Sequence, residues 1–151
     1  MSRHVFRLLV LALLPLAASC GGDEEATGPI SNDLIGSWDA TTIEIVSVAS
    51  PDLNVELLAL GGHSRLVLEA NADFGLSVGV PGEPTEFAGG VWSSTNFLIL
   101  TFDSGEIEGT WRFDYGLNGD NLRLTGATAG WDFDGDEVED PAIFNLTMVR
   151  L

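Results

Sequence analysis

The chain has 151 residues, of which 23 are acidic and 6 are basic, and its formal net charge is −17. It contains no lysine. Such a charge argues against nucleic-acid binding, which depends on neutralising phosphates with Lys and Arg, and against electrostatic adhesion to anionic lipid. Small cations are the favoured electrostatic partners.

The first 19 residues have the pattern of a secretory signal segment. Arg3 and Arg7 precede the apolar run LLVLALLPLAAS, which ends in small residues. The run is about a dozen residues long and is broken by Pro15, whereas a membrane-spanning helix needs roughly 20 apolar residues. Residues 1–19 are therefore predicted to be a removable signal and not a transmembrane anchor.

The stretch from Leu16 to Cys20 resembles the lipobox of bacterial lipoproteins, with Ala17 at a position where leucine is more common. Cys20 is the single cysteine, and a lone cysteine in an exported chain calls for an explanation, which lipidation supplies. The resemblance implies that Cys20 is acylated and anchors the chain stably in a membrane. Gly21 stands where aspartate often marks inner-membrane retention, so the outer membrane of a two-membrane host is expected.

Residues 20–33 are predicted to form the lipidated cysteine and a flexible acidic tether. The sequence GGDEEATGPISND has too little apolar surface to offset the entropy of ordering it. Its flexible reach would be roughly 20 Å. Loss of the signal removes Arg3 and Arg7 but no acid, which takes the formal charge from −17 to −19. Residues 34–151 suit one small domain.

This domain has an all-β pattern, since short β-branched and aromatic runs recur between clusters of Gly, Asn, Asp and Ser. Tight turns are predicted between several runs, including one at Asn118-Gly119, a pair suited to positive φ. Eight strands are expected, at residues 35–48, 64–70, 73–80, 86–93, 96–102, 107–116, 121–127 and 142–150.

Sequential hairpins predict an up-and-down antiparallel meander in which one face of most strands is buried. Trp111 and Phe113 alternate with Arg112, whereas residues 97–100 are apolar on both faces. An open meander would leave two exposed edges, and closure removes them. An eight-stranded barrel is therefore the expected fold.

The triplet Gly36-Ser37-Trp38 resembles the Gly-x-Trp motif that opens the first strand in lipocalin and lipocalin-like families. In those families a basic residue late in the last strand packs over this tryptophan, and Arg150 is placed to do so. The resemblance implies a cup for a small apolar molecule. A barrel of this size can equally be filled by its own side chains. The expected interior residues are Phe74, Leu76, Phe97, Ile99, Trp111 and Phe113.

An acidic loop precedes the last predicted strand, with carboxylates at relative positions 1, 3, 5 and 9. Ca²⁺ takes six to eight oxygen ligands, and this spacing resembles the calcium loops of the EF-hand and dockerin type. Glu137 replaces the expected glycine, and Ile143 replaces the expected last acid. As a possible Ca²⁺ site, the predicted ligands are Asp132, Asp134, Asp136 and Asp140, with a backbone carbonyl near Val138.

The sequence gives no convincing catalytic site. His63 is the one histidine after the signal segment, and Gly61-Gly62 beside it predicts an exposed turn. A cysteine nucleophile is excluded if Cys20 is acylated. The expected function is thus a non-enzymatic, membrane-anchored binding module of the cell envelope for a small apolar ligand. The alternative is a structural or protein-interaction module with a filled barrel, stabilised by calcium.

Overall fold

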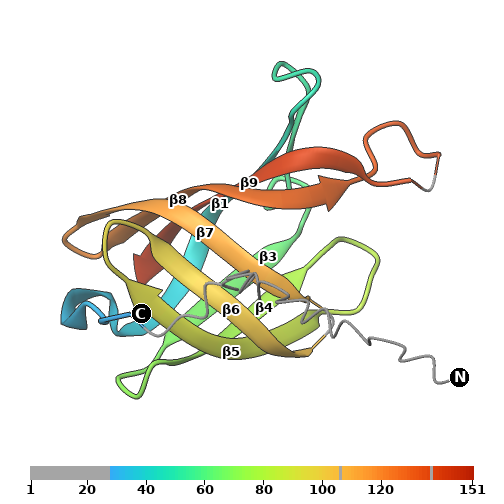
Figure 1. Ribbon diagram of the computed structural model, residues 1–151. Coiled ribbons are helices and arrows are strands. Elements are labelled where there is room, and N and C mark those ends of the chain that lie inside the picture. The colour runs from blue at the N-terminus through green and yellow to red at the C-terminus, as the bar shows by residue number, and fades with distance from the viewer. Residues whose placement is uncertain (1–27, 106, 137) are drawn as a thin grey trace, which may run out of the picture.

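The computed structural model describes residues 28–105, 107–136 and 138–151 of the chain. They form nine strands and a short 3₁₀ helix, η1 (Asn32–Leu34), shown in Figure 1. The strands are β1 (Gly36–Ser47), β2 (Asn54–Glu56), β3 (His63–Leu68), β4 (Asp73–Gly79), β5 (Glu86–Ser94), β6 (Leu98–Gly105), β7 (Gly109–Asn118), β8 (Asn121–Trp131) and β9 (Asp140–Arg150).

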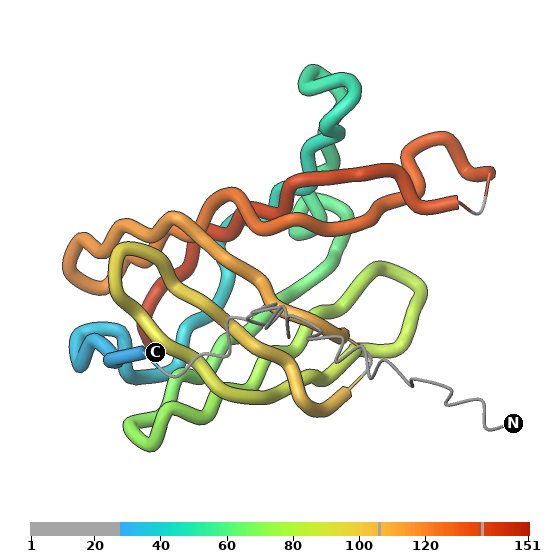
Figure 2. Tube along the Cα trace, viewed as in Figure 1, coloured from blue at the N-terminus to red at the C-terminus, as the bar shows by residue number. Residues whose placement is uncertain are grey.

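The strands make a closed antiparallel barrel, as the sequence predicts. Strand β1 and strands β3 to β9 pair in chain order, and β9 closes the sheet by pairing with β1 from Trp38↔Arg150 to Ser47↔Ala142. Closure leaves none of these eight strands as an open edge. The continuous wall can be followed in the tube of Figure 2.

Strand β2 is an addition that the sequence analysis missed. Strand β1 is long enough to pair twice on one side, with β3 along residues 36–39 and with β2 along residues 44–46. Strand β2 therefore covers the part of β1 that extends beyond β3. The same far part of the barrel carries the long β8–β9 ribbon, where pairing continues to Trp131↔Asp140, past the predicted strand end at residue 127.

The two ends of the barrel differ. The packed end carries η1 and the β3–β4, β5–β6 and β7–β8 turns, and the last of these contains Gly119 at φ 58°, as predicted. The open end carries the β1–β2, β4–β5, β6–β7 and β8–β9 connections. Large apolar side chains fill the packed end and the middle of the barrel, among them Leu34, Trp38, Leu66, Trp92, Leu98, Leu100, Phe113, Leu122, Leu124 and Met148.

Residues 28–33, which the sequence analysis gave to the tether, contact the barrel at its packed end. The carbonyl of Pro29 accepts a hydrogen bond from the Ser94 amide (2.8 Å), and the Ser31 amide donates to Ser94 Oγ (2.6 Å). The chain therefore joins the barrel before residue 34. The predicted signal, Cys20 and the first part of the tether lie outside the described residues. In the described ranges, no helix is long and apolar enough to cross a membrane.

Candidate functional site

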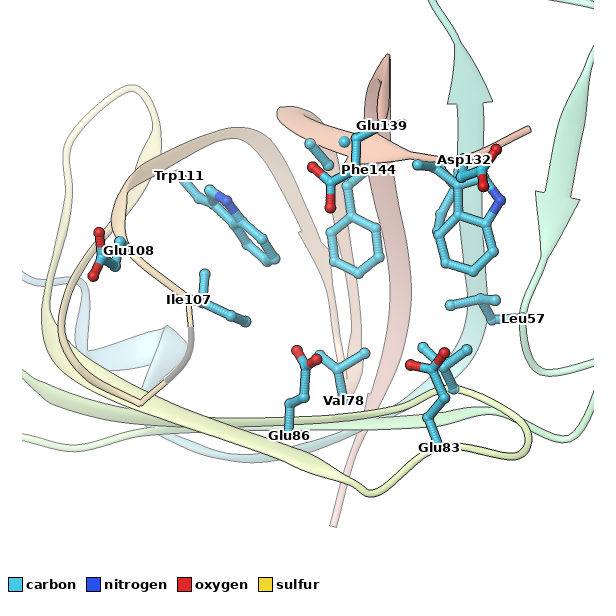
Figure 3. A pocket seen from close by; sticks show the side chains of 15 residues that line it. Leu57, Val78, Glu83, Glu86, Ile107, Glu108, Trp111, Asp132, Glu139 and Phe144 are labelled. Atoms are coloured by element: carbon cyan, nitrogen blue, oxygen red, sulfur yellow. The ribbon is translucent and has the colours of Figure 1, made fainter. Parts of the chain in front are cut away.

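The open end of the barrel holds a cavity of about 780 Å³, shown in Figure 3. Drug-sized ligands occupy clefts of roughly 300 to 1,000 Å³. Strands from both sides of the barrel and three of the open-end connections contribute to its lining. The lining residues are Ile45, Leu57, Val78, Val80, Glu83, Glu86, Ile107, Glu108, Trp111, Ala129, Gly130, Trp131, Asp132, Glu139 and Phe144.

Aromatic side chains separate the cavity from the packed end. Trp111 and Phe144 line the cavity with ring centroids 5.1 Å apart. Beneath them, Phe102 meets Trp111 edge to face at 5.1 Å, and Phe74 meets Phe102 in the same way at 5.1 Å. Edge-to-face pairs of this kind stabilise one another beyond their area burial. The cavity thus has a rigid apolar floor built from four strands.

Carboxylates surround this floor. Glu83 and Glu86 point into the cavity from the β4–β5 side, and Glu139 points in from the opposite side (Figure 3). Glu108 and Asp132 complete the set, and the lining contains no basic side chain. The Glu139 side chain packs across Gly130, where a Cβ atom would meet its carboxylate. The cavity is therefore apolar below and acidic at its mouth.

Four of the six residues expected in the barrel interior do lie inside. Phe74, Leu76 and Phe113 are buried in the core, and Trp111 is half-buried in the cavity wall. Of these four, Trp111 alone lines the cavity; the others belong to the packed core. Their alternation with polar neighbours was sufficient to assign the correct face of each strand.

The assignment of Phe97 and Ile99 to the interior is wrong. The inward side chains of β6 are Leu98, Leu100 and Phe102, which are buried, so Ile99 lies on the outer face by alternation. Ile99 pairs with Arg112 across the β6–β7 ladder, and the Arg112 guanidinium lies 3.6 Å from the centre of the Phe97 ring. These two apolar residues are thus covered from outside by an arginine.

Sequence reasoning missed most of the cavity lining. The strand residues Ile45, Val78 and Phe144 each follow the inward alternation of their strand at its open-end half. The acids Glu83 and Glu108 come from connections, where no periodicity marks them. A search for inward positions near the open-end connections could have found the strand residues, but not the acids.

The predicted contact between Arg150 and Trp38 is present at the packed end. The Arg150 guanidinium lies 4.1 Å from the indole centre, and Nη1 donates to the Ile35 carbonyl (2.6 Å). The Trp38 indole N–H donates to the Leu34 carbonyl (2.9 Å). At Gly36 a Cβ atom would lie 2.6 Å from Arg150 Nη1, so the glycine makes room for the arginine. These contacts hold η1 against the barrel.

Three of the predicted calcium ligands lie together in the β8–β9 connection. Asp132, Asp134 and Asp136 each offer a carboxylate oxygen within 4.8 Å of the other two. Backbone amides already bond to these oxygens, from Gly135 to Asp132 Oδ1 (2.7 Å) and from Val138 to Asp136 Oδ1 (2.9 Å). The carboxylates therefore shape the loop themselves, and exposed acidic groups commonly gather without a metal.

Of the other two predicted ligands, Asp140 is outside the three-carboxylate group, because it begins β9 and pairs there with Trp131. Val138 is an exposed loop residue whose amide donates to Asp136 Oδ1, and this bond leaves the predicted role of its carbonyl untested. Calcium binding by this loop stays a prediction.

His63 is exposed, as expected, although it begins β3 and does not lie in the preceding turn. Its ring covers Gly79 on the neighbouring strand, and Nε2 lies 3.3 Å from Thr85 Oγ1. It does not line the open-end cavity. The cavity therefore brings together acids and aromatic rings without an imidazole.

The comparisons with known proteins add no relative. No family model matches this chain, and no curated protein matches it. The resemblance to lipocalin-like proteins stays a prediction from the sequence.

The carboxylate of Glu56 fixes the connection that brings Leu57 to the cavity. Glu56 Oε1 accepts hydrogen bonds from the Ile43 amide (2.9 Å) and the Leu58 amide (3.3 Å), and Oε2 accepts one from the Ala59 amide (2.6 Å). These bonds, with the Ile43 amide first among them, hold the pKa of Glu56 below its ordinary value of 4.5.

A carboxylate with a lowered folded-state pKa stabilises the fold above its unfolded-state pKa, and this contribution is lost as pH falls through the folded-state value. Glu56→Gln is therefore expected to lower the melting temperature at pH 7, with a smaller deficit at pH 3. Thermal unfolding by circular dichroism across this range measures both. Glu69→Gln, which changes an exposed acid at the packed end, serves as the control. An equal Glu56→Gln deficit at both pH values would contradict this role.

Proposed function

We propose that this protein is a lipid-anchored barrel of the bacterial cell envelope that binds a small apolar molecule in its open-end cavity. The observation that carries the proposal is the difference between the two ends. Large buried apolar side chains occupy one end of the barrel, whereas the other end retains about 780 Å³ above Trp111 and Phe144. A purely structural barrel would have no need of such a space.

The walls of the cavity suit an apolar ligand. Val78, Ile107 and Trp111 line the space and are half-buried, so a ligand that enters it can contact their apolar surface. Burying apolar ligand area there contributes about 25 cal/mol per Å² before the costs of association. Concave sites of this size are typical of small-molecule binding.

The described chain begins at the end of the barrel opposite the cavity. The chain reaches the packed end at Gly28, where it contacts Ser93 and Ser94 on β5. Cys20 precedes Gly28 by eight residues, which span at most about 28 Å when extended. Acylation of Cys20 would therefore hold the packed end nearest the membrane and leave the cavity mouth open to solvent.

Native mass spectrometry tests the ligand proposal. The full chain, carried in detergent micelles and incubated with a total lipid extract, is expected to show a noncovalent adduct that leaves on collisional activation. Ala129→Trp should abolish the adduct, because residue 129 lines the cavity and an indole there would occupy it.

Thr128→Trp provides the matched control. Thr128 is the exposed neighbour of Ala129 on β8, so the same side chain is added outside the barrel. The Thr128→Trp variant should keep the adduct. A bare polypeptide mass for the unaltered chain, or an adduct that survives Ala129→Trp, would refute binding in the cavity.

A further inference from the structure

The charge distribution in the open-end cavity narrows the chemistry of its ligand. Five acidic side chains line it, and no basic side chain does. Glu83 and Glu86 face Glu139 across the mouth, so a ligand that enters passes between carboxylates on opposite sides (Figure 3). Like charges held around one opening repel one another, and a cation placed between them relieves that repulsion.

The basic side chains of the described residues lie outside the lining of this cavity. Its basic side chains other than His63 are four arginines, and none lines the cavity. Arg65 forms a bidentate pair with Asp39 on the outer face, and Arg112 lies over Phe97. Arg150 is held at the packed end by Trp38. Arg123 is exposed on β8, away from the cavity lining. A ligand can therefore supply a positive charge that the described lining does not.

Two tryptophans add a second feature that suits a cation. Trp111 and Trp131 both line the cavity, beside its acids. An indole face attracts an ammonium group, and the attraction grows as the group loses water. Aromatic and carboxylate groups together can hold an organic ammonium ion, whereas a bare metal ion would gain nothing from the apolar floor.

We infer that the ligand is an amphiphilic organic cation: an apolar body that lies on the Trp111–Phe144 floor and an amine that lies among Glu83, Glu86 and Glu139 at the mouth. This inference rests on the proposed function, because it specifies the ligand of the same cavity. It also excludes a class, since the carboxylate of a fatty acid would meet acids on both sides. The cavity therefore selects by head-group charge.

Three probes with the same ten-carbon chain separate the contribution of the apolar chain from that of the head-group charge. They are decylammonium, decan-1-ol and decanoate, each titrated into the full chain by calorimetry at low salt. Decylammonium should bind about tenfold or more tighter than decanoate, with decanol between them. Raising NaCl to about 0.5 M should weaken decylammonium binding and leave decanol binding unchanged, because salt screens only the charged contribution.

Two double variants, each of which removes two negative charges, test whether the preference for decylammonium comes from the carboxylates at the mouth. Glu83→Gln combined with Glu86→Gln should remove most of the preference for decylammonium and keep decanol affinity. Glu69→Gln combined with Asp114→Asn removes the same charge from exposed positions outside the cavity lining and should keep the preference. If the Glu83→Gln, Glu86→Gln double variant keeps the preference for decylammonium, the inference is overturned.

The outcomes also separate this inference from the proposed function. Equal affinity for the three probes would overturn the selection of cations and leave an apolar binding cavity. Tighter binding of decanoate than of the other two probes would overturn the selection of cations in the same way. Failure of all three probes to bind would refute both the inference and the cavity function on which it depends.

Discussion

Trp38→Ala is expected to destabilise the barrel by about 3 to 5 kcal/mol, which is the range for removing a fully buried tryptophan. Trp38 has no exposed surface, and its indole N–H bonds to the Leu34 carbonyl of η1. Its removal also leaves the Arg150 guanidinium without the ring over which it lies. Loss of the Trp38 side chain therefore opens a void in the core and also removes the hydrogen bond that holds η1 against the barrel.

Urea unfolding, followed by circular dichroism, measures this change through the midpoint at constant m-value. Trp131→Ala is the matched control, because Trp131 is half-buried in the cavity wall and not fully buried. Its removal should cost less than half as much. If Trp38→Ala costs no more than Trp131→Ala, the packed end is not held by the Trp38 contacts.

The closed barrel could be predicted because two physical requirements agreed. Alternation such as Trp111 and Phe113 against Arg112 identified half-buried strands, and the short connections between them allowed only sequential antiparallel pairing. The need to remove edge strands then favoured closure. The contact between Trp38 and Arg150 came from the family resemblance, and the strand register places both residues opposite each other at the closing seam.

Two features could not be predicted from local pattern. Residues 97–100 are apolar at every position, so period-two alternation could not decide which face is inside; pairing of Ile99 with Arg112 decides it. Strand β2 has three residues, too few for alternation to identify a strand, and β1 offers it a partner because β1 extends past β3. Both outcomes are set by neighbouring strands and not by the segment itself.

The acidic mouth was also beyond reach of sequence reasoning. In a chain with 23 acids, nearness of carboxylates along the sequence carries little information. Glu83, Glu108 and Glu139 are far apart in the chain. They line the same cavity because three connections at the open end of the barrel carry them. The carboxylates between Asp132 and Asp140 can be recognised in the sequence by their regular spacing. The cavity beside them cannot, because it depends on the sizes of side chains that come from several strands.

Gly90→Ala is expected to cost about 1 to 3 kcal/mol, although it adds one methyl group. The β5–β6 ladder shifts register between Gly89 and Gly90, which brings the β6 backbone close to Gly90. A Cβ atom there would overlap the Thr101 carbonyl oxygen and lie 3.0 Å from the Phe102 Cα. Because these are backbone atoms of a paired strand, no side-chain rotation can relieve the overlap, and the strands must move apart.

Gly75→Ala tests whether this cost comes from the close approach or from loss of glycine in a strand. Gly75 lies on β4, opposite Gly89, and a Cβ atom there would meet nothing within 4 Å. Its replacement should change stability by no more than about 0.5 kcal/mol, since alanine also restricts the unfolded chain. Urea midpoints that fall equally in both variants would mean that the loss comes from replacing a strand glycine in general and not from the close approach at Gly90. A large loss at Gly90 alone would identify the irregular register as the feature that positions Phe102 beneath the cavity floor.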